Sequence, residues 1–196
     1  MAIRSFTWAD FYELLDFINL TRNSSGDSLG LSPTSLREEL ARPGLSPEEN
    51  CHLFVDERAT QEGNGLWAYS ILHPELKIGR SVLELGVHPS LSEPGAEKEV
   101  ISVAVSRSRS LGPSILHIGV TPSEYWEATM KSEGFSLSRC YWLMRWQGSE
   151  VPSTDLPLGY GIESFQPGDE VRLTRVQNAS FGGCWGFCPN TVEEVS

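Results

Sequence analysis

The sequence lacks any apolar run approaching the roughly 18 residues that a membrane-spanning helix needs, and no charged-then-apolar leader opens it. Basic residues are few, since 15 Lys and Arg stand against 26 Asp and Glu, for a net charge of −11. Nucleic acids bind basic protein surfaces, and anionic membranes repel an acidic chain. We therefore expect neither a nucleic acid nor a membrane as a partner.

Cysteine is scarce as well. The four cysteines stand at positions 51, 140, 184 and 188, and this scattered placement is typical of reduced thiols in a cytoplasmic protein. Cys184 and Cys188 form a C-x3-C pair, but a structural zinc site takes four ligands and no second pair accompanies them. We expect no metal site.

What the sequence does contain is an approximate repeat. "AIRSFTWADFYELLDFINLTR" at 2–22 resembles "YGIESFQPGDEVRLTRVQNASF" at 160–181 when the two are aligned 159 positions apart without gaps. The identical pairs are Ile3 and Ile162, Ser5 and Ser164, Phe6 and Phe165, Asp10 and Asp169, Leu14 and Leu173, and Asn19 and Asn178. If the next loop is three residues shorter in the second copy, "SPTSLREE" at 32–39 also matches "CPNTVEEV" at 188–195, with Pro33 on Pro189.

The spacing of the repeat indicates how the chain divides into domains. A period near 160 is too long for a solenoid and equals the length of a whole domain. We interpret residues 1–148 as one complete domain, residues 149–159 as a Pro/Gly/Ser-containing linker, and residues 160–196 as the start of a second, truncated domain. The alternative is two ordinary strand–turn–helix starts that favour the same residue types.

The hydrophobic pattern predicts a mixed α/β domain (α+β mixed) with the order β-α-α-β-β-β-α-β-α-β. Strands are expected at 2–6, 51–57, 66–72, 81–88, 115–120 and 135–146, the last as one or two strands, and helices at about 11–22, 33–42, 96–111 and 122–133. "TWAD" at 7–10 and "TPSE" at 121–124 resemble capping boxes that open helices. A strand–helix–strand crossover predicts that part of the central sheet is parallel, with helices on both faces.

Three short stretches, taken with this element order, resemble the GNAT superfamily of acyl-CoA-dependent N-acetyltransferases. They are "LELGVHPS" at 83–90, similar to the central strand of the family, "SEPGAEKEV" at 92–100, where the family has its pyrophosphate loop, and "VTPSEYWEATMKSEGF" at 120–135, similar to a strand–helix segment. The tail stretch "CWGFCPNTVEE" at 184–194 resembles tandem-domain members such as mycothiol synthase, in which the second domain opens in a similar way.

The resemblance implies acetyl-CoA or another acyl-CoA as cofactor and a small amine as acceptor. In the family, backbone groups of the central strand bind the pantetheine, and loop N–H groups at a helix N-terminus bind the pyrophosphate. Carried over to this chain, the cofactor-binding positions are Leu85, Gly86, Val87, Ser92, Gly95, Ala96, Glu97, Lys98 and Ser123. Glu84 on the central strand is a weak candidate for the base, and the catalytic residues are otherwise unknown.

The sequence also departs from the family pattern. Ser92 stands at the usual Arg/Gln position, and Glu97 stands at a Gly/Ala position, where its carboxylate would repel a pyrophosphate. Lys98, one residue on, is a candidate to compensate this charge. Met130 stands where the family has the Tyr that protonates the leaving thiolate, and a thioether cannot donate a proton. The simplest reading of Glu97 without a cofactor is an acid in a solvated first turn.

These observations lead to two hypotheses. In the first, the whole protein transfers an acyl group from acyl-CoA to an amine, while this N-terminal domain is weak or inactive, and the loss of its acyl-CoA site is left open. In the second, the domain is a non-catalytic pseudo-acetyltransferase used for acyl-CoA binding, scaffolding or assembly. An unrelated α/β binding module is the third option, and a central strand at 83–88 without a splay would select it. The apolar residues of 160–196 also predict a possible homodimer.

Overall fold

The computed structural model describes residues 2–24, 30–56, 65–89, 95–142, 144, 146, 148, 150 and 155–195. The chain divides into two compact units, Met1–Phe135 and Ser136–Ser196, so that the first unit ends earlier than residue 148. Among the described residues, none of the helices combines the length and the apolar character that crossing a membrane requires.

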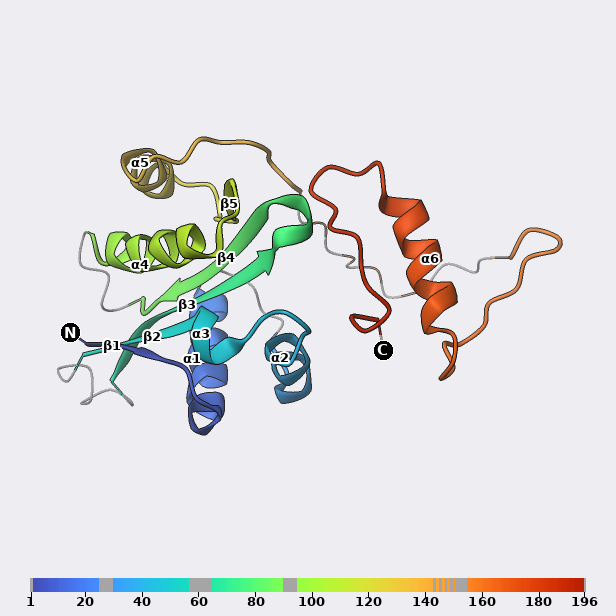
Figure 1. Cartoon of the computed structure of the whole chain (residues 1–196), viewed down its shortest axis with the longest axis horizontal. Coiled ribbons are helices and arrows are strands. Elements are labelled where there is room, and N and C mark those ends of the chain that lie inside the picture. The colour runs from blue at the N-terminus through green and yellow to red at the C-terminus, as the bar shows by residue number, and fades with distance from the viewer. Residues whose placement is uncertain are drawn as a thin grey trace. The chain divides into compact units, whose positions relative to one another are not determined.

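A five-stranded mixed sheet forms the centre of the first unit (Figure 1). Its strands follow the order of the chain: β1 (Ala2–Ser5), β2 (Cys51–Val55), β3 (Leu66–Glu75), β4 (Arg80–Val87) and β5 (Ile115–Ile118). The pairs β1–β2, β2–β3 and β3–β4 are antiparallel, whereas β4 and β5 are parallel. The expectation of a partly parallel sheet is thus confirmed, because a helical crossover joins β4 to β5.

Helices cover both faces of this sheet, as the sequence predicted (Figure 1). One face carries α1 (Phe11–Ser24) and α2 (Pro33–Leu40), and the other carries α4 (Ala96–Leu111) and α5 (Glu124–Ser132). The short α3 (Pro47–Asn50) leads directly into β2, and Arg107 of α4 bonds two of its residues, Glu49 and Asn50. The single turn α3 was not predicted. Its sequence "SPEEN" does hold the signal, since proline suits the first position of a helix.

Side chains at the helix starts explain where the helices begin. The Asp10 carboxylate accepts the Thr7 backbone N–H at 2.8 Å, as a capping box requires. Ser32 caps α2 by accepting the Ser35 N–H at 3.0 Å. The second expected capping box, at 121–124, is wrong: Ser123 caps α5 by accepting the Trp126 N–H at 3.1 Å. The helix therefore begins at Glu124, after Pro122 rather than with it.

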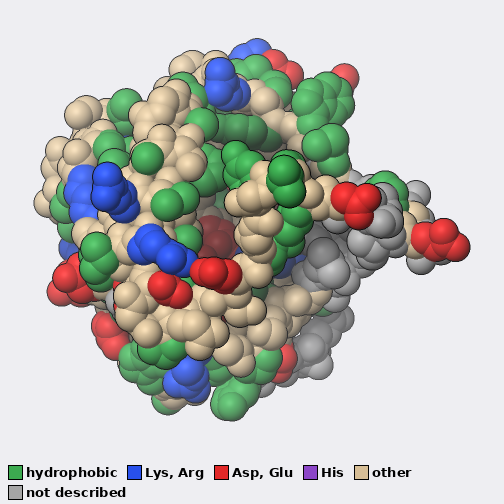
Figure 2. All heavy atoms as spheres, turned by 90° about the vertical axis from the view of Figure 1, so that its right-hand side faces the viewer, with side chains coloured by type: hydrophobic (Ala, Val, Ile, Leu, Met, Phe, Trp, Pro, Cys, Tyr) green, Lys and Arg blue, Asp and Glu red, His purple; other side chains and the backbone are tan. Residues whose placement is uncertain are grey.

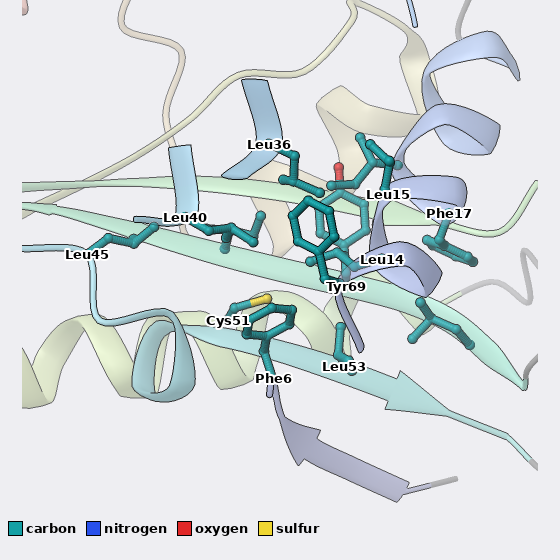
Figure 3. Close-up of a cluster of buried hydrophobic side chains, with 14 residues drawn as sticks. Phe6, Leu14, Leu15, Phe17, Leu36, Leu40, Leu45, Cys51, Leu53 and Tyr69 are labelled. Atoms are coloured by element: carbon teal, nitrogen blue, oxygen red, sulfur yellow. The ribbon is translucent and has the colours of Figure 1, made fainter. Parts of the chain in front are cut away.

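The core on the α1 and α2 face is a single apolar cluster (Figure 3). Leu14 of α1 and Leu36 of α2 are completely buried, and so are Phe6 and Leu53. The Phe17 and Tyr69 rings meet edge to face at 6.1 Å. On the opposite face, α4 packs against the sheet in a second cluster, formed by Phe54, Trp67, Ala68 and Val100. Alternate residues of β2 thus serve the two cores, as the pleat dictates.

The strand or strands expected at 135–146 are absent from the described residues of that stretch. Its described apolar side chains are instead solvent-exposed: Trp142 is 92% exposed and Met144 is 89% exposed. The residue types suit a strand, but a strand also needs a hydrogen-bonding neighbour. β5 is the last strand of the sheet as the structure describes it, and no strand is assigned to the described residues of the stretch. The prediction failed because it rested on propensity alone.

In its described residues the second unit has the helix α6 (Glu170–Phe181). Hydrogen bonds around this helix repeat those of the first unit. The Asp169 carboxylate accepts the Gln166 N–H at 3.1 Å, as that of Asp10 accepts the Thr7 N–H. Asn178 bonds both backbone groups of Asn190, at 2.9 and 3.0 Å. Asn19 bonds both backbone groups of Leu31 in the same way, at 2.6 and 3.1 Å.

These bonds correct the alignment of the repeat beyond Asn178. Thr191 accepts the Glu194 N–H at 3.3 Å, and the Glu194 carboxylate accepts the Thr191 N–H at 2.6 Å. Thr191 therefore takes the capping role of Ser32, and the separation stays at 159 positions. The three-residue shortening, which matched Pro33 with Pro189, is wrong. The shorter loop was inferred by matching the two prolines. The hydrogen bonds instead show that the two capping residues correspond.

Much of the apolar surface of the second unit is exposed. The exposed large side chains from 156 onward are Leu156, Leu158, Tyr160, Ile162, Phe165, Val171, Val176, Phe181 and Trp185. Figure 2 shows hydrophobic side chains at the surface, among charged ones, on the face that it draws. A groove lies between the 163–165 segment and α6, lined by Phe165, Leu173 and Val176. The equivalent residues of the first unit, Phe6, Leu14 and Phe17, are buried against the sheet.

Candidate functional site

The site begins where β4 and β5 part. The parallel pairing runs from Arg80 and Ile115 to Leu83 and Ile118, where β5 ends. β4 continues to Val87, and throughout this extension it pairs with β3. The described residues thus leave one edge of β4, from 84 to 87, without a strand beside it. A ladder that ends at Leu83 agrees with the splayed strand expected at 83–88, whose absence would have selected an unrelated module.

Two predicted binding residues present their backbone to this open edge. The His88 N–H bonds the Trp67 carbonyl at 2.8 Å, so that the backbone of residue 88 faces β3. Successive residues of a strand turn their backbone groups to opposite sides. Leu85 and Val87 therefore direct N–H and C=O groups away from β3, toward the open edge. An extended ligand with amide groups, such as a pantetheine, can bond such an edge as a strand does.

Gly86, between them, is required by close packing on the other face of the strand. A Cβ at this position would lie 2.4 Å from Cε1 of Tyr69 and 2.9 Å from Oγ1 of Thr21. The Tyr69 ring therefore passes directly over the backbone of Gly86. Glycine at position 86 leaves room for this ring. Its own backbone groups face β3 and therefore do not reach the open edge.

Glu84, the weak base candidate, is the first residue of β4 beyond the parallel pairing. Its Oε1 accepts a hydrogen bond from the Tyr69 hydroxyl at 2.9 Å and lies 3.3 Å from Nη2 of Arg22. The side chain is 27% exposed, so that the carboxylate is held in place but still reaches solvent. Burial raises the pKa of Tyr69, and the neighbouring Glu84 carboxylate raises it further. Tyr69 is thus a neutral donor that orients Glu84.

Two further titratable groups lie near Glu84, and no sequence motif points to them. Carboxylate oxygens of Glu39 and Glu84 and a ring nitrogen of His73 all lie within 4.8 Å of one another. Burial raises the pKa of Glu39, as does the charge of Glu84, whereas burial lowers the pKa of His73. The three groups are close enough to share a metal ion, although Arg22 already pairs with Glu84. Their positions in α2 and β3 are far apart in the chain, so no local motif reveals them.

The start of α4 differs from what a pyrophosphate site needs. Gly95 caps the helix with a φ of 105°, which glycine adopts without strain, and Ala96 is the first helical residue. Glu97 is only 4% exposed and accepts a hydrogen bond from the Tyr125 hydroxyl. The reading of Glu97 as a solvated acid of the first turn is therefore wrong. Packing of α5 against α4 buries it.

The remaining predicted residues are not gathered around an open anion site. Nζ of Lys98 lies 3.5 Å from the Glu133 carboxylate, so that the two opposite charges form an ion pair. The Ser123 hydroxyl caps α5. Met130, at the position of the family tyrosine, is nearly buried. Ser92 lies outside the described residues.

Comparison with solved structures finds acetyltransferases. The GCN5-related N-acetyltransferase from Sphaerobacter thermophilus is 17% identical, with a TM-score of 0.67, and the match covers 98% of this chain and 61% of that one. A GNAT superfamily phosphinothricin acetyltransferase from Sinorhizobium meliloti, solved in complex with AcCoA, is 13% identical, with a TM-score of 0.56, over 70% of this chain and 76% of that one.

The ribosomal-protein-S18-alanine N-acetyltransferase from Escherichia coli is 14% identical, with a TM-score of 0.54, and the match covers 70% of this chain and 79% of that one. No protein-family model and no curated protein sequence matches. The chain spans 61% of the length of the Sphaerobacter protein. At these identities the likeness concerns the fold, and the fold of this chain is that of the GNAT N-acetyltransferases.

Proposed function

We propose that this chain is part of an acyl-CoA-dependent N-acyltransferase with tandem domains, and that its first domain is itself weak or inactive. The whole protein would transfer an acetyl or other acyl group from CoA to a small amine. The observation that carries the proposal is the parting of β4 from β5 after Leu83 and Ile118. It leaves a strand edge, at Leu85 and Val87, on which an acyl-pantetheine can lie.

The residues fit an acyl-CoA at one end of the site only. The open β4 edge suits the pantetheine. The start of α4 does not suit a pyrophosphate, because Glu97 places a buried carboxylate there and Tyr125 bonds it. A second anion close to this carboxylate is repelled. For this reason we assign no transfer step to the first domain.

Glu84 is the residue best placed to serve an amine. An amine that attacks a carbonyl carbon must lose a proton, and a carboxylate within hydrogen-bond reach can take it. The Tyr69 hydroxyl and Arg22 fix the position of the Glu84 carboxylate at the point where the strands part. No general acid stands at 130, because Met130 has no proton to give.

The tandem organisation rests on the repeated hydrogen bonds. Asp169, Asn178 and Thr191 make the same bonds as Asp10, Asn19 and Ser32, always 159 positions later. We take residues 160–196 as the start of a second domain of the same fold, resembling the arrangement of mycothiol synthase. Four free cysteines agree with a cytoplasmic location, which is part of the proposal.

The second candidate function is a non-catalytic pseudo-acetyltransferase domain that binds acyl-CoA or acts as a scaffold. Glu97 at the start of α4 and Met130 in place of the tyrosine favour it for this domain. Assembly would use the exposed apolar face of α6, where Val171 is 65% exposed and Val176 is 56% exposed. A homodimer through residues 160–196 belongs to this second candidate.

A thermal melt with and without acetyl-CoA tests the proposal. A ligand at a hundred times its dissociation constant stabilises the folded state by about 2.7 kcal/mol, which is several degrees for a domain of this size. We expect a small shift at millimolar acetyl-CoA and none with an equal ionic strength of salt. A large shift would mean that the first domain binds the cofactor well and is a candidate enzyme. No shift for acetyl-CoA or for acetyl-pantetheine would remove the acyl-CoA proposal for this domain.

A further inference from the structure

A contact between α4 and α5 stands where a cofactor would need open backbone groups. The Tyr125 hydroxyl, from the first turn of α5, donates a hydrogen bond to Oε2 of Glu97, in the first turn of α4. Burial raises the pKa of Tyr125, and the neighbouring Glu97 carboxylate raises it further. The phenol is thus a neutral donor to this carboxylate.

The burial of Glu97 distinguishes it from the other acid in this turn. Glu97 is 4% exposed, whereas Glu99 is exposed, as acids in a first turn ordinarily are. A carboxylate is rarely buried unless it is hydrogen-bonded, because leaving water costs it free energy. The Tyr125 hydroxyl supplies that bond. The pair is therefore a specific contact between two helices rather than a chance surface arrangement.

A second contact holds the same two helices together. Nζ of Lys98 lies 3.5 Å from the carboxylate of Glu133, just beyond the end of α5. The Lys98 backbone N–H bonds the Gly95 carbonyl at 3.1 Å and is not free for a ligand. Lys98, the basic residue next to Glu97 in the sequence, is thus directed toward α5. It does not neutralise the Glu97 carboxylate that an approaching anion would meet.

We infer that the Glu97–Tyr125 contact is an autoinhibitory plug: a buried carboxylate and a half-exposed phenol of the chain itself occupy the start of α4 and exclude ligands that carry a pyrophosphate. The inference rests on the proposed function, because it concerns the same acyl-CoA site. The open β4 edge remains available, since Leu85 and Val87 belong to a different part of the site. The plug therefore obstructs the diphosphate of the ligand but leaves the strand edge free for its pantetheine.

The test compares two ligands and three forms of the whole chain by isothermal titration calorimetry. The ligands are acetyl-CoA and acetyl-pantetheine, which carries the same thioester without the pyrophosphate. The forms are the unmodified chain, Glu97→Ala and Glu99→Ala. The last is the matched control, because it removes the same charge from the same turn without touching the plug. A circular-dichroism melt confirms that each variant is folded.

We expect Glu97→Ala to bind acetyl-CoA at least about tenfold more tightly than the unmodified chain, since one like-charge contact is removed. Acetyl-pantetheine should bind all three forms equally, and Glu99→Ala should leave both affinities unchanged. Tyr125→Phe, which frees Glu97 to turn toward solvent, should tighten acetyl-CoA binding by a smaller factor. It also provides a second variant should Glu97→Ala fold poorly.

Two results would overturn the plug while leaving the proposed function intact. One is equal acetyl-CoA affinity in the unmodified chain, Glu97→Ala and Tyr125→Phe, with acetyl-pantetheine bound by all. The other is equal tightening in Glu97→Ala and Glu99→Ala, which would make the effect one of net charge alone. If no form binds either ligand, the proposed function fails, and the plug has no cofactor to exclude.

Discussion

Asn178 holds the backbone of Asn190 from both sides, accepting its N–H at 2.9 Å and donating to its carbonyl at 3.0 Å. The same clamp joins Asn19 to Leu31 in the first unit. In each case the side chain holds the backbone of the residue that directly precedes the next capping residue. The clamp is the clearest structural sign that the two units share a local fold.

Asn19→Ala should lower the free energy of unfolding of the first unit by about 2 kcal/mol. The substitution removes two hydrogen bonds and leaves both backbone groups of Leu31 without that partner. Urea denaturation followed by tryptophan fluorescence measures the loss. Asn178→Ala is the control, and we expect it to leave the midpoint of the first unit unchanged. An equal shift in both variants would mean that the two units unfold together.

Leu14→Ala should destabilise the first unit by about 3 kcal/mol, because Leu14 is completely buried and the cavity would be lined by α1 and the sheet. Leu173→Ala, at the equivalent place in the second unit, should cost less than about 1 kcal/mol, since the described lining of its groove comes from residues 163–176 alone. Far-ultraviolet circular dichroism in urea measures both losses.

The same pair of variants tests the homodimer. If another copy of the chain covers the groove, Leu173→Ala will cost as much as Leu14→Ala, and the stability of the unmodified chain will rise with protein concentration. Sedimentation at several concentrations gives the oligomeric state directly. A monomer at all concentrations, with a small effect of Leu173→Ala, would contradict assembly through this face.

Gly86→Ala should destabilise the first unit by about 2 kcal/mol. Its Cβ would clash with Cε1 of Tyr69 at 2.4 Å, and the buried ring has little room to withdraw. Gly119→Ala is the matched control, because a Cβ there meets nothing within 4 Å. Thermal melts of the two variants provide the measurement. If both lose the same stability, the Tyr69 packing is not the reason for glycine at 86.

The lowered pKa of His73 predicts that the first unit loses stability in mild acid. Burial lowers its pKa below the ordinary value of 6.5, Glu84 and Glu75 raise it, and Arg42 lowers it. The unfolded chain therefore binds a proton that the folded chain does not, and the free energy of unfolding falls as the pH drops through 6.5. His73→Gln should make this fall shallower between about pH 7.5 and 5.5.

Urea denaturation at each pH measures this slope. Burial raises the pKa of Glu39, so that its protonation favours the folded state and opposes the trend as the pH falls. An unchanged slope in His73→Gln would show that His52 or His117, whose pKa values burial also lowers, accounts for the loss.

The sequence by itself determined the features that depend on neighbours in the chain. The Thr7–Asp10 capping box, the start of α2 at Pro33 and the span of α4 from Ala96 to Leu111 all follow from residues within a few positions of one another. Hydrophobic periodicity likewise gave the five strands that pair and the crossover that makes β4 and β5 parallel. The repeat, with equivalent residues 159 positions apart, could be detected in the sequence because its capping residues and its asparagine are local signals.

Only the tertiary structure decided the features that depend on contacts between distant segments. Glu97 has the local sequence of a solvated acid, yet Tyr125, on another helix, buries it. The grouping of Glu39, His73 and Glu84 depends on how α2 and β3 meet β4. The stretch 135–146 has the composition of a strand, but pairing requires a free edge in register, which no residue of the stretch can encode alone. Local propensity is fixed by the chain, whereas burial and pairing are fixed by what the fold brings beside it.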